Sequence, residues 1–254
     1  MKHRLKDRIV IITGASSGMG KAMALQFAAE GAKLVLNGRS ETKLQSLVDE
    51  LEPYREQVAW LAGDVSLFET NNALVDLALE RFGGLDTIVC NAGTLGLGSV
   101  TSLAQEDWHY TLNSNVSALF YLSKCALPHM EKKGFGVVLA NASIAAFKAF
   151  PQHPAYCASK AAQVALVRQI AVEYGPTIRA NAMCPGPVDT PMIWDSTKAF
   201  EAGEEAVEDA QKATALKRLG QPNDISELAL FLISDESSWM TGSAVTIDGG
   251  ITIQ

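Results

Sequence analysis

The fold is decided by the stretch Ile9-Val10-Ile11-Ile12-Thr13-Gly14-Ala15-Ser16-Ser17-Gly18-Met19-Gly20. Its first four residues are β-branched and predict a short strand that is buried on both faces. Residues 21–30 are rich in Ala, Leu, Met and Phe and end at Gly31, which predicts a helix. Glycines let a backbone approach a pyrophosphate, and the free N–H groups at a helix start attract its charge. The stretch therefore predicts a dinucleotide-binding turn between a strand and a helix.

Strands and helices continue to alternate along the chain. Further apolar strands are expected at residues 32–37, 57–62, 85–90, 136–142, 177–184 and 244–247. Helices are expected at residues 41–51, 66–82, 105–132, 154–171 and 224–234, the third of them bent near Asn113-Ser114-Asn115. Strands that are apolar throughout belong to parallel sheets covered on both faces. We expect one α/β domain over residues 1–254, a single-domain Rossmann-type doubly wound parallel sheet with helices on both faces.

The segment at about 190–219 differs from the rest of the chain. It contains few large apolar residues and carries the acidic residues Glu201, Glu204, Glu205, Glu208 and Asp209. We expect a substrate flap or solvated helices here, with the acidic side chains in water rather than around a cation.

The composition excludes several classes of protein. The 254 residues are 48% hydrophobic and carry a net charge of −7 without a Lys/Arg cluster, which disfavours nucleic acid as a partner. The N-terminus does not read as a signal peptide, and no apolar run is long enough to span a membrane. Four widely spaced cysteines fit reduced thiols of a cytoplasmic protein, with no disulfide framework and no metal site.

A possible acid/base pair lies at the start of the helix that Pro154 opens. Tyr156 and Lys160 are four residues apart and so share one helix face. A cation about 4 Å from the phenol supplies roughly 4 kcal/mol at an effective dielectric near 20, or about three pKa units. We expect Lys160 to lower the pKa of Tyr156 toward neutrality.

Several short motifs follow one another along the chain. They are Thr13-Gly14 with Gly18 and Gly20, Asn91-Ala92-Gly93, Asn115, Ser143, Tyr156 with Lys160, Pro185-Gly186 and Asp248-Gly249-Gly250. In these motifs the chain resembles the short-chain dehydrogenases/reductases over essentially its whole length. The resemblance implies an NAD(P)(H)-dependent oxidoreductase that transfers hydride between the nicotinamide and a secondary alcohol or ketone.

The resemblance also assigns roles to individual residues. Tyr156 would exchange a proton with the substrate oxygen, Ser143 would hold that oxygen, Lys160 would lower the Tyr156 pKa and grip the nicotinamide ribose, and Asn115 would position a relay water. The residues implied to contact the cofactor are Gly14, Ser16, Ser17, Gly18, Met19, Gly20, Arg39, Asp64, Val65, Asn91, Ala92, Gly93, Tyr156, Lys160, Pro185, Gly186, Val188 and Thr190.

The end of the second strand bears on the choice of cofactor. An acidic residue there would accept the ribose 2′-hydroxyl, whereas a cation accommodates a 2′-phosphate. Arg39 occupies this position and favours NADP(H) over NAD(H). Ser17 weakens that preference, because NADP-preferring relatives often have a basic residue at its position.

The expected substrate pocket is mostly apolar. Its expected lining residues are Ser143, Thr94, Leu95, Ile144, Ala145, His153, Pro187, Met192 and Trp194, which include no Lys or Arg. A small neutral ketone or alcohol fits this set better than a charged acid. His153 could donate to a substrate oxygen or be an ordinary loop histidine.

Two other functions remain open at this stage. A 3-ketoacyl-thioester reductase of fatty-acid or polyketide type shares the same four catalytic residues, and a non-catalytic NAD(P)-binding sensor usually lacks the Tyr or the Lys. Enoyl reductases of the superfamily space Tyr and Lys more widely. Residues 116–130 and 158–171 are apolar nearly all round and must bury a second face, so we expect a homotetramer or homodimer.

Overall fold

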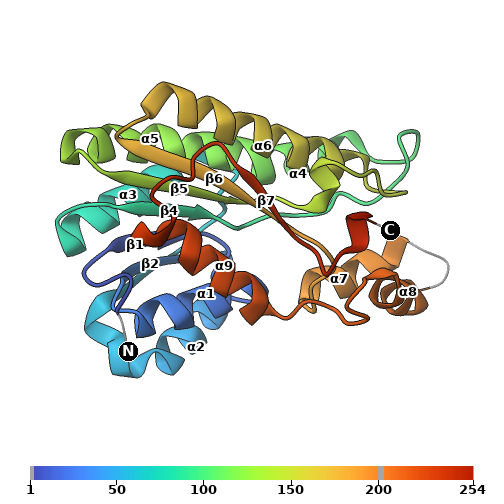
Figure 1. Ribbon diagram of the computed structural model, residues 1–254, viewed down its shortest axis with the longest axis horizontal. Helices are drawn as coiled ribbons and strands as arrows, with labels where there is room; N and C mark the ends of the chain where they lie inside the picture. The colour runs from blue at the N-terminus through green and yellow to red at the C-terminus, as the bar shows by residue number, and fades with distance from the viewer. Residues whose placement is uncertain (1–2, 200–202, 254) are drawn as a thin grey trace.

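Seven parallel strands form one sheet in the computed structural model, which describes residues 3–199 and 203–253 (Figure 1). The strands are β1 (Ile9–Ile12), β2 (Lys33–Gly38), β3 (Val58–Ala62), β4 (Thr87–Cys90), β5 (Gly136–Asn141), β6 (Ile178–Pro185) and β7 (Ala244–Ile247). Their order across the sheet is β3-β2-β1-β4-β5-β6-β7. The strand order therefore reverses between β1 and β4, and the crevice between the carboxyl ends of these two strands is where such sheets bind ligands.

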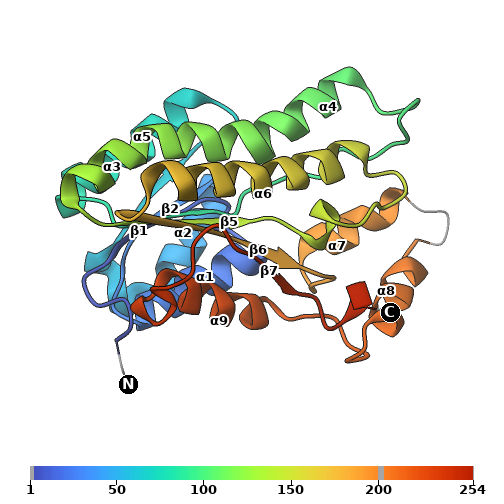
Figure 2. The ribbon, with the colours of Figure 1, turned by 45° about the horizontal axis from the view of Figure 1, so that its top comes forward.

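Two layers of helices cover the sheet (Figures 1 and 2). One face carries α1 (Gly18–Ala29), α2 (Glu41–Glu50) and α9 (Pro222–Ile233). The other face carries α3 (Phe68–Phe82), α4 (Gln105–Leu112), α5 (Ala118–Lys133) and α6 (Pro154–Tyr174). Successive side chains of β1 enter opposite cores, Val10 and Ile12 with α1 and α9, Ile9 and Ile11 with α3 and α5. The predicted doubly wound sheet is confirmed.

Short elements complete the chain. Short 3-10 helices span Glu52–Gln57, Ile144–Ala146, Thr197–Ala199, Asp235–Ser237 and Ile251–Ile253. In the described part of the chain, no helix is long and apolar enough to cross a membrane.

The predicted bend in the long helix is a π-turn. Asn113–Ser117 lies between α4 and α5, and the Ala118 N–H donates to the Asn113 carbonyl five residues back. The wider turn places Asn115, which is 1% exposed, in the interior beside α6.

The first helix begins earlier than expected. The sequence predicts a start at Lys21, but α1 begins at Gly18, inside the glycine turn, with the Lys21 N–H already donating to the Ser17 carbonyl. The first turn of a helix leaves its N–H groups without helical acceptors. Those of α1 consequently lie within the glycine turn itself.

The segment expected as a flap contains two helices in its described parts. These are α7 (Pro191–Ser196) and α8 (Glu205–Ala213), which lie beyond the carboxyl ends of the strands (Figure 2). Val207 is buried, whereas the neighbouring acidic side chains of α8 are exposed. Glu201 lies outside the described residues.

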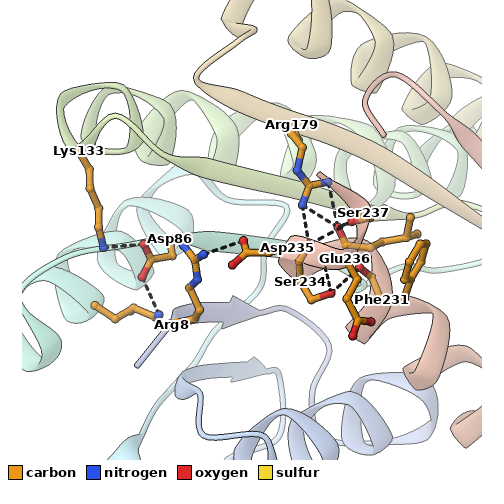
Figure 3. Close-up of polar contacts among 11 residues, drawn as sticks. Arg8, Asp86, Lys133, Arg179, Phe231, Ser234, Asp235, Glu236 and Ser237 are labelled. Carbon is orange, nitrogen blue, oxygen red and sulfur yellow. Dashed lines mark hydrogen bonds and ion pairs between the residues drawn. The ribbon is translucent and has the colours of Figure 1, made fainter. Parts of the chain in front are cut away.

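The amino-terminal edge of the sheet is held by ion pairs and hydrogen bonds (Figure 3). Asp86 accepts from the Ile9 N–H and pairs with Lys133, while Arg8 pairs with Asp235. Arg179 donates to the carbonyls of Leu232, Ser234 and Met240, at and just beyond the end of α9. These contacts lie at the amino-terminal ends of the strands, whereas the ligand cleft expected from the strand order lies at their carboxyl ends.

Candidate active site

The glycine turn and the end of β4 are joined by hydrogen bonds. The Thr13 hydroxyl accepts from the Asn91 N–H at 3.0 Å and from the Ala92 N–H at 3.1 Å. The Asn91 amide in turn donates to the carbonyls of Thr13 and Gly14 at 3.0 and 3.1 Å. These contacts fix the walls of a cleft of about 180 Å³ at the carboxyl ends of β1, β2 and β4.

Two glycines of the turn are required by different constraints. Gly14 has a φ of +63°, and a Cβ there would lie 2.8 Å from the Ala92 Cα. At Gly20 a Cβ would lie 2.1 Å from the Gly14 carbonyl oxygen and 2.6 Å from the Asn91 Nδ2. Gly20 therefore lets α1 pack against its own turn, and it lies outside the cleft lining.

At the adenosine end of the expected cofactor site, three side chains form a chain of hydrogen bonds. Arg39 Nη1 donates to the Tyr110 hydroxyl at 3.1 Å, and that hydroxyl donates to Asp64 Oδ2 at 2.9 Å. Partial burial would raise the pKa of Asp64, but hydrogen bonds from Ser66 and Tyr110 outweigh it and lower that pKa. Asp64 is therefore an anion at neutral pH, with Arg39 as its nearby cation.

The structure brings most of the predicted cofactor residues to this cleft. Those that line it are Gly14, Ser16, Ser17, Gly18, Met19, Arg39, Asp64, Val65, Asn91, Ala92, Gly93 and Thr190. Pro185, Gly186, Val188 and Tyr156 line the neighbouring cavity instead, and Lys160 lines neither of the two. Tyr110 and Ser114 also line the cleft and were not expected, because only the folding of α4 and the π-turn brings them there.

The start of α6 holds the predicted acid/base pair. Lys160 is 3% exposed, and its Nζ lies 5.4 Å from the centroid of the Tyr156 ring. The same Nζ donates to the Asn141 carbonyl at 2.8 Å and to Gln163 Oε1 at 2.9 Å. The ammonium group is therefore held from β5 and from its own helix.

The expected direction of the Tyr156 pKa shift is wrong in this structure. Burial raises the pKa of Tyr156 to about 12, against a hydrogen bond with Ser143 that lowers it. Burial also lowers the pKa of Lys160 to about 7. The estimate from sequence counted the attraction between the two groups but not the desolvation of both. At neutral pH Tyr156 is a neutral phenol that can donate a proton.

Asn115 has protein partners for its whole side-chain amide. Its Oδ1 accepts from the Thr94 N–H at 2.9 Å, and its Nδ2 donates to the Thr94 carbonyl and to Ser159 Oγ at 3.0 and 2.8 Å. The Asn115 carbonyl accepts from Gln163 Nε2 at 2.7 Å. The role of Asn115 in positioning a relay water stays a prediction.

A second cavity of about 460 Å³ adjoins the cleft beneath α7 and α8. Predicted residues that line it are Ser143, Leu95, Ile144, Ala145, His153, Pro187 and Met192, together with Tyr156. Residues that sequence reasoning missed are Ala142, Phe150, Pro151, Ile193, Ser196, Ala206, Val207, Asp209, Ala210 and Ile251. They come from the segment before α6, from α7 and α8 and from the C-terminus, and no local pattern marks them.

Three predicted pocket residues have more specific positions. Thr94 lines the cofactor cleft rather than the apolar cavity. Trp194 lies outside both cavities, 42% exposed, because its Nε1 donates to Asp189 Oδ1 at 2.9 Å. His153 is 6% exposed and bonds through Nδ1 to the Pro151 carbonyl at 2.7 Å, with its ring edge toward Tyr156.

Known proteins with sequences similar to this chain are oxidoreductases. Residues 14–252 match a family model described as enoyl-(acyl carrier protein) reductase. A 7alpha-hydroxysteroid dehydrogenase of Escherichia coli K12 is 36% identical over 97% of this chain and 95% of its own. A 3-oxoacyl-[acyl-carrier-protein] reductase of Thermotoga maritima is 34% identical over 98% of this chain and 100% of its own.

A solved structure gives the same result in three dimensions. The crystal structure of levodione reductase superimposes with a TM-score of 0.94 at 33% identity, over 98% of this chain and 99% of that one. Sequence and fold thus agree with these relatives over nearly the whole length. The chain belongs to the short-chain dehydrogenase/reductase family of oxidoreductases.

Proposed function

We propose that this protein is an NAD(P)(H)-dependent oxidoreductase that interconverts a secondary alcohol and a ketone. The observation that carries the proposal is the position of Tyr156 and Ser143. Both line the apolar cavity, which shares Met19, Thr190 and Met192 with the glycine-turn cleft. The buried Lys160 Nζ lies 5.4 Å from the centroid of the Tyr156 ring. A proton donor and a second hydroxyl thus face one place for a substrate oxygen, with the Lys160 amine beside the phenol ring.

The cleft residues fit a dinucleotide. A Cβ at Gly14 would lie 2.8 Å from the Ala92 Cα, so the glycine lets the turn pack against the end of β4. Helix α1 starts within this turn, where the N–H groups of its first turn can bind a phosphate. Ser114 lines the cleft, and its buried hydroxyl has no hydrogen-bond partner among the described residues. Gly14, Gly18, Asp64, Asn91 and Thr190 would hold the nucleotide, which supplies the hydride donor or acceptor when bound.

Side chains of this protein would transfer the proton and stabilise the groups that lose or gain it. Tyr156, neutral at pH 7, donates its proton to a ketone oxygen in the reductive direction and accepts it back from the alcohol in the other. The hydroxyl of Ser143 hydrogen-bonds the same oxygen. Lys160 stabilises the phenolate that forms, since a cation near the ring favours the anion.

The cavity supports a neutral, apolar substrate. Among the described residues that line it, none is Lys or Arg, and the one acid, Asp209, is exposed on α8. A carboxylate or phosphate would therefore find no charge partner there. The names of two relatives, a hydroxysteroid dehydrogenase and an oxoacyl reductase, also describe reactions at a hydroxyl or oxo group.

A 3-ketoacyl-thioester reductase is the second candidate. The 34% identity to the Thermotoga maritima enzyme favours it. The spacing of Tyr156 and Lys160 argues against the enoyl reductase named by the family model, because that chemistry goes with a wider spacing of the pair. Parallel assays with a ketoacyl thioester and an alicyclic ketone, following nicotinamide absorbance, separate the two remaining candidates.

For the cofactor we propose NADP(H) over NAD(H). Arg39 is exposed at the end of β2 and lines the cleft, where its guanidinium can meet a 2′-phosphate. The Tyr110 hydroxyl already holds Arg39 in this position.

The test of the proposed function is Tyr156→Phe, which removes the proton donor and keeps the ring. Turnover of the best substrate from a ketone and alcohol panel should fall about a hundred- to ten-thousand-fold, while nucleotide affinity stays the same. Tyr174→Phe at the end of the same helix is the matched control. Unchanged turnover in the Tyr156 variant would overturn the mechanism.

We also propose that the chain forms a homotetramer or homodimer in the cytoplasm. Exposed large apolar side chains on α5, on α6 and in the turn before β7 favour assembly, with Phe120 48%, Val172 82% and Trp239 99% exposed. The four cysteines are unpaired, which fits a reducing compartment.

A further inference from the structure

We propose that Gln163 is a positioning residue that holds the Lys160 ammonium group and ties it to the main-chain carbonyl of Asn115. Gln163 follows Lys160 by three residues on α6 and is 1% exposed. Its Oε1 accepts from Lys160 Nζ at 2.9 Å, and its Nε2 donates to the Asn115 carbonyl at 2.7 Å. The inference rests on the proposed function only in giving Lys160 a catalytic role.

The partners fix the orientation of the amide. Lysine has no acceptor, so the atom that faces Nζ must be the amide oxygen, and the nitrogen then faces the carbonyl. Burying an amide costs free energy unless both of its ends are bonded. Both ends of Gln163 meet this condition, one on α6 and one on the π-turn that carries Asn115.

Lys160 needs this acceptor because few charges surround it. The titratable groups that face it are Tyr156 on its own helix and Cys184 on β6. Burial raises their pKa values to about 12 and about 11, so neither is an anion at neutral pH. From β5 the contact is the Asn141 carbonyl, and a Cβ at Gly93, after β4, would lie 3.8 Å from Nζ.

Two carbonyl-type oxygens therefore compensate the buried charge, the main-chain one of Asn141 and the side-chain one of Gln163. An ammonium group has three donors, so these bonds leave one for a ligand. Mutation can remove the Gln163 acceptor without touching the backbone. The amide does not release a proton at neutral pH, so the Gln163 bridge holds Lys160 in place but does not conduct protons from it.

The deciding experiment measures the Lys160 pKa directly. Protein carrying ¹³C-labelled lysine is titrated by NMR, and the Lys160 signal is assigned as the one missing from Lys160→Arg. Gln163→Met keeps the length of the side chain and removes the acceptor, so the pKa should fall by about one unit or more. Gln163→Glu places a carboxylate beside Nζ, so the pKa should rise.

Activity provides the second readout. If protonated Lys160 is the active form, turnover falls as pH rises through its pKa. That fall should move to lower pH in Gln163→Met and to higher pH in Gln163→Glu. Gln169→Met, at an exposed position of the same helix, should move neither the titration nor the pH profile.

A purely structural role for Gln163 gives a different result. Both variants would then lower the unfolding midpoint and leave the Lys160 titration where it is, which would overturn the proposal. Failure of the proposed function has another signature, because Tyr156→Phe would then turn over normally while the Lys160 pKa still responded to Gln163.

Discussion

Gly20→Ala tests whether packing or helix propensity decides how an alanine at position 20 changes the stability of the protein. Gly20 lies inside α1, where alanine is preferred to glycine by about 1 kcal/mol. Propensity alone therefore predicts a more stable protein. The structure predicts the opposite, because the new Cβ would lie 2.1 Å from the Gly14 carbonyl oxygen, an atom of the backbone that no side-chain rotation can move away.

The size of the effect follows from the contacts around that Cβ. The helix and its turn would have to separate by about 1 Å, and overpacking of this kind costs about 1–3 kcal/mol. The displacement also strains the Asn91 amide, which lies 2.6 Å from the Cβ and bonds the carbonyls of Thr13 and Gly14. With each lost hydrogen bond worth about 1 kcal/mol, we expect a net loss of about 2 kcal/mol.

Urea unfolding followed by far-UV circular dichroism measures this loss, and a fluorescence titration with nucleotide measures the accompanying fall in affinity. Gly84→Ala is the matched control, because a Cβ there has no neighbour closer than 3.7 Å. That variant should be as stable as the parent or slightly more so. A Gly20 variant with parental stability and nucleotide affinity would refute the packing argument.

Three further outcomes are expected. Arg39→Asp should shift the ratio of kcat/KM values from NADP(H) toward NAD(H), and an unchanged ratio would remove Arg39 from cofactor selection. Arg179→Met should lower the free energy of unfolding by about 3 kcal/mol, because the carbonyls shown in Figure 3 lose a charged donor; a loss below ~0.5 kcal/mol would mean that they find other partners. Light scattering should give a dimer or tetramer mass, and a monomer mass would contradict the proposed assembly.

The parts of the fold that the sequence predicted well are those determined by residues close together in the sequence. Strands β1 and β3 are unbroken apolar runs, and Ser40 caps α2 by accepting from the Lys43 N–H at 3.3 Å. The bend near Asn115 also follows from local chemistry, since Asn and Ser compete for backbone hydrogen bonds. Helix ends were less predictable, and α1 starts three residues early because a glycine turn can itself be helical.

The parts that sequence could not give depend on distant contacts. Tyr110 reaches the cleft through the packing of α4, and Ile251 reaches the apolar cavity from the far end of the chain. Trp194 was expected in that cavity, but an exposed hydrogen bond to Asp189 holds it outside. The Tyr156 pKa was misjudged for the same kind of reason, because the cost of burial depends on what surrounds the pair in space.

Met19, Thr190 and Met192 line both the glycine-turn cleft and the apolar cavity. A shared wall means that two ligands bound side by side cannot have independent free energies of binding. If a nucleotide orders the two flexible methionines, it changes the affinity for the second ligand by some factor. The second ligand must then change the affinity for the nucleotide by that same factor. A factor of one in both titrations would show that the shared wall does not couple the two ligands.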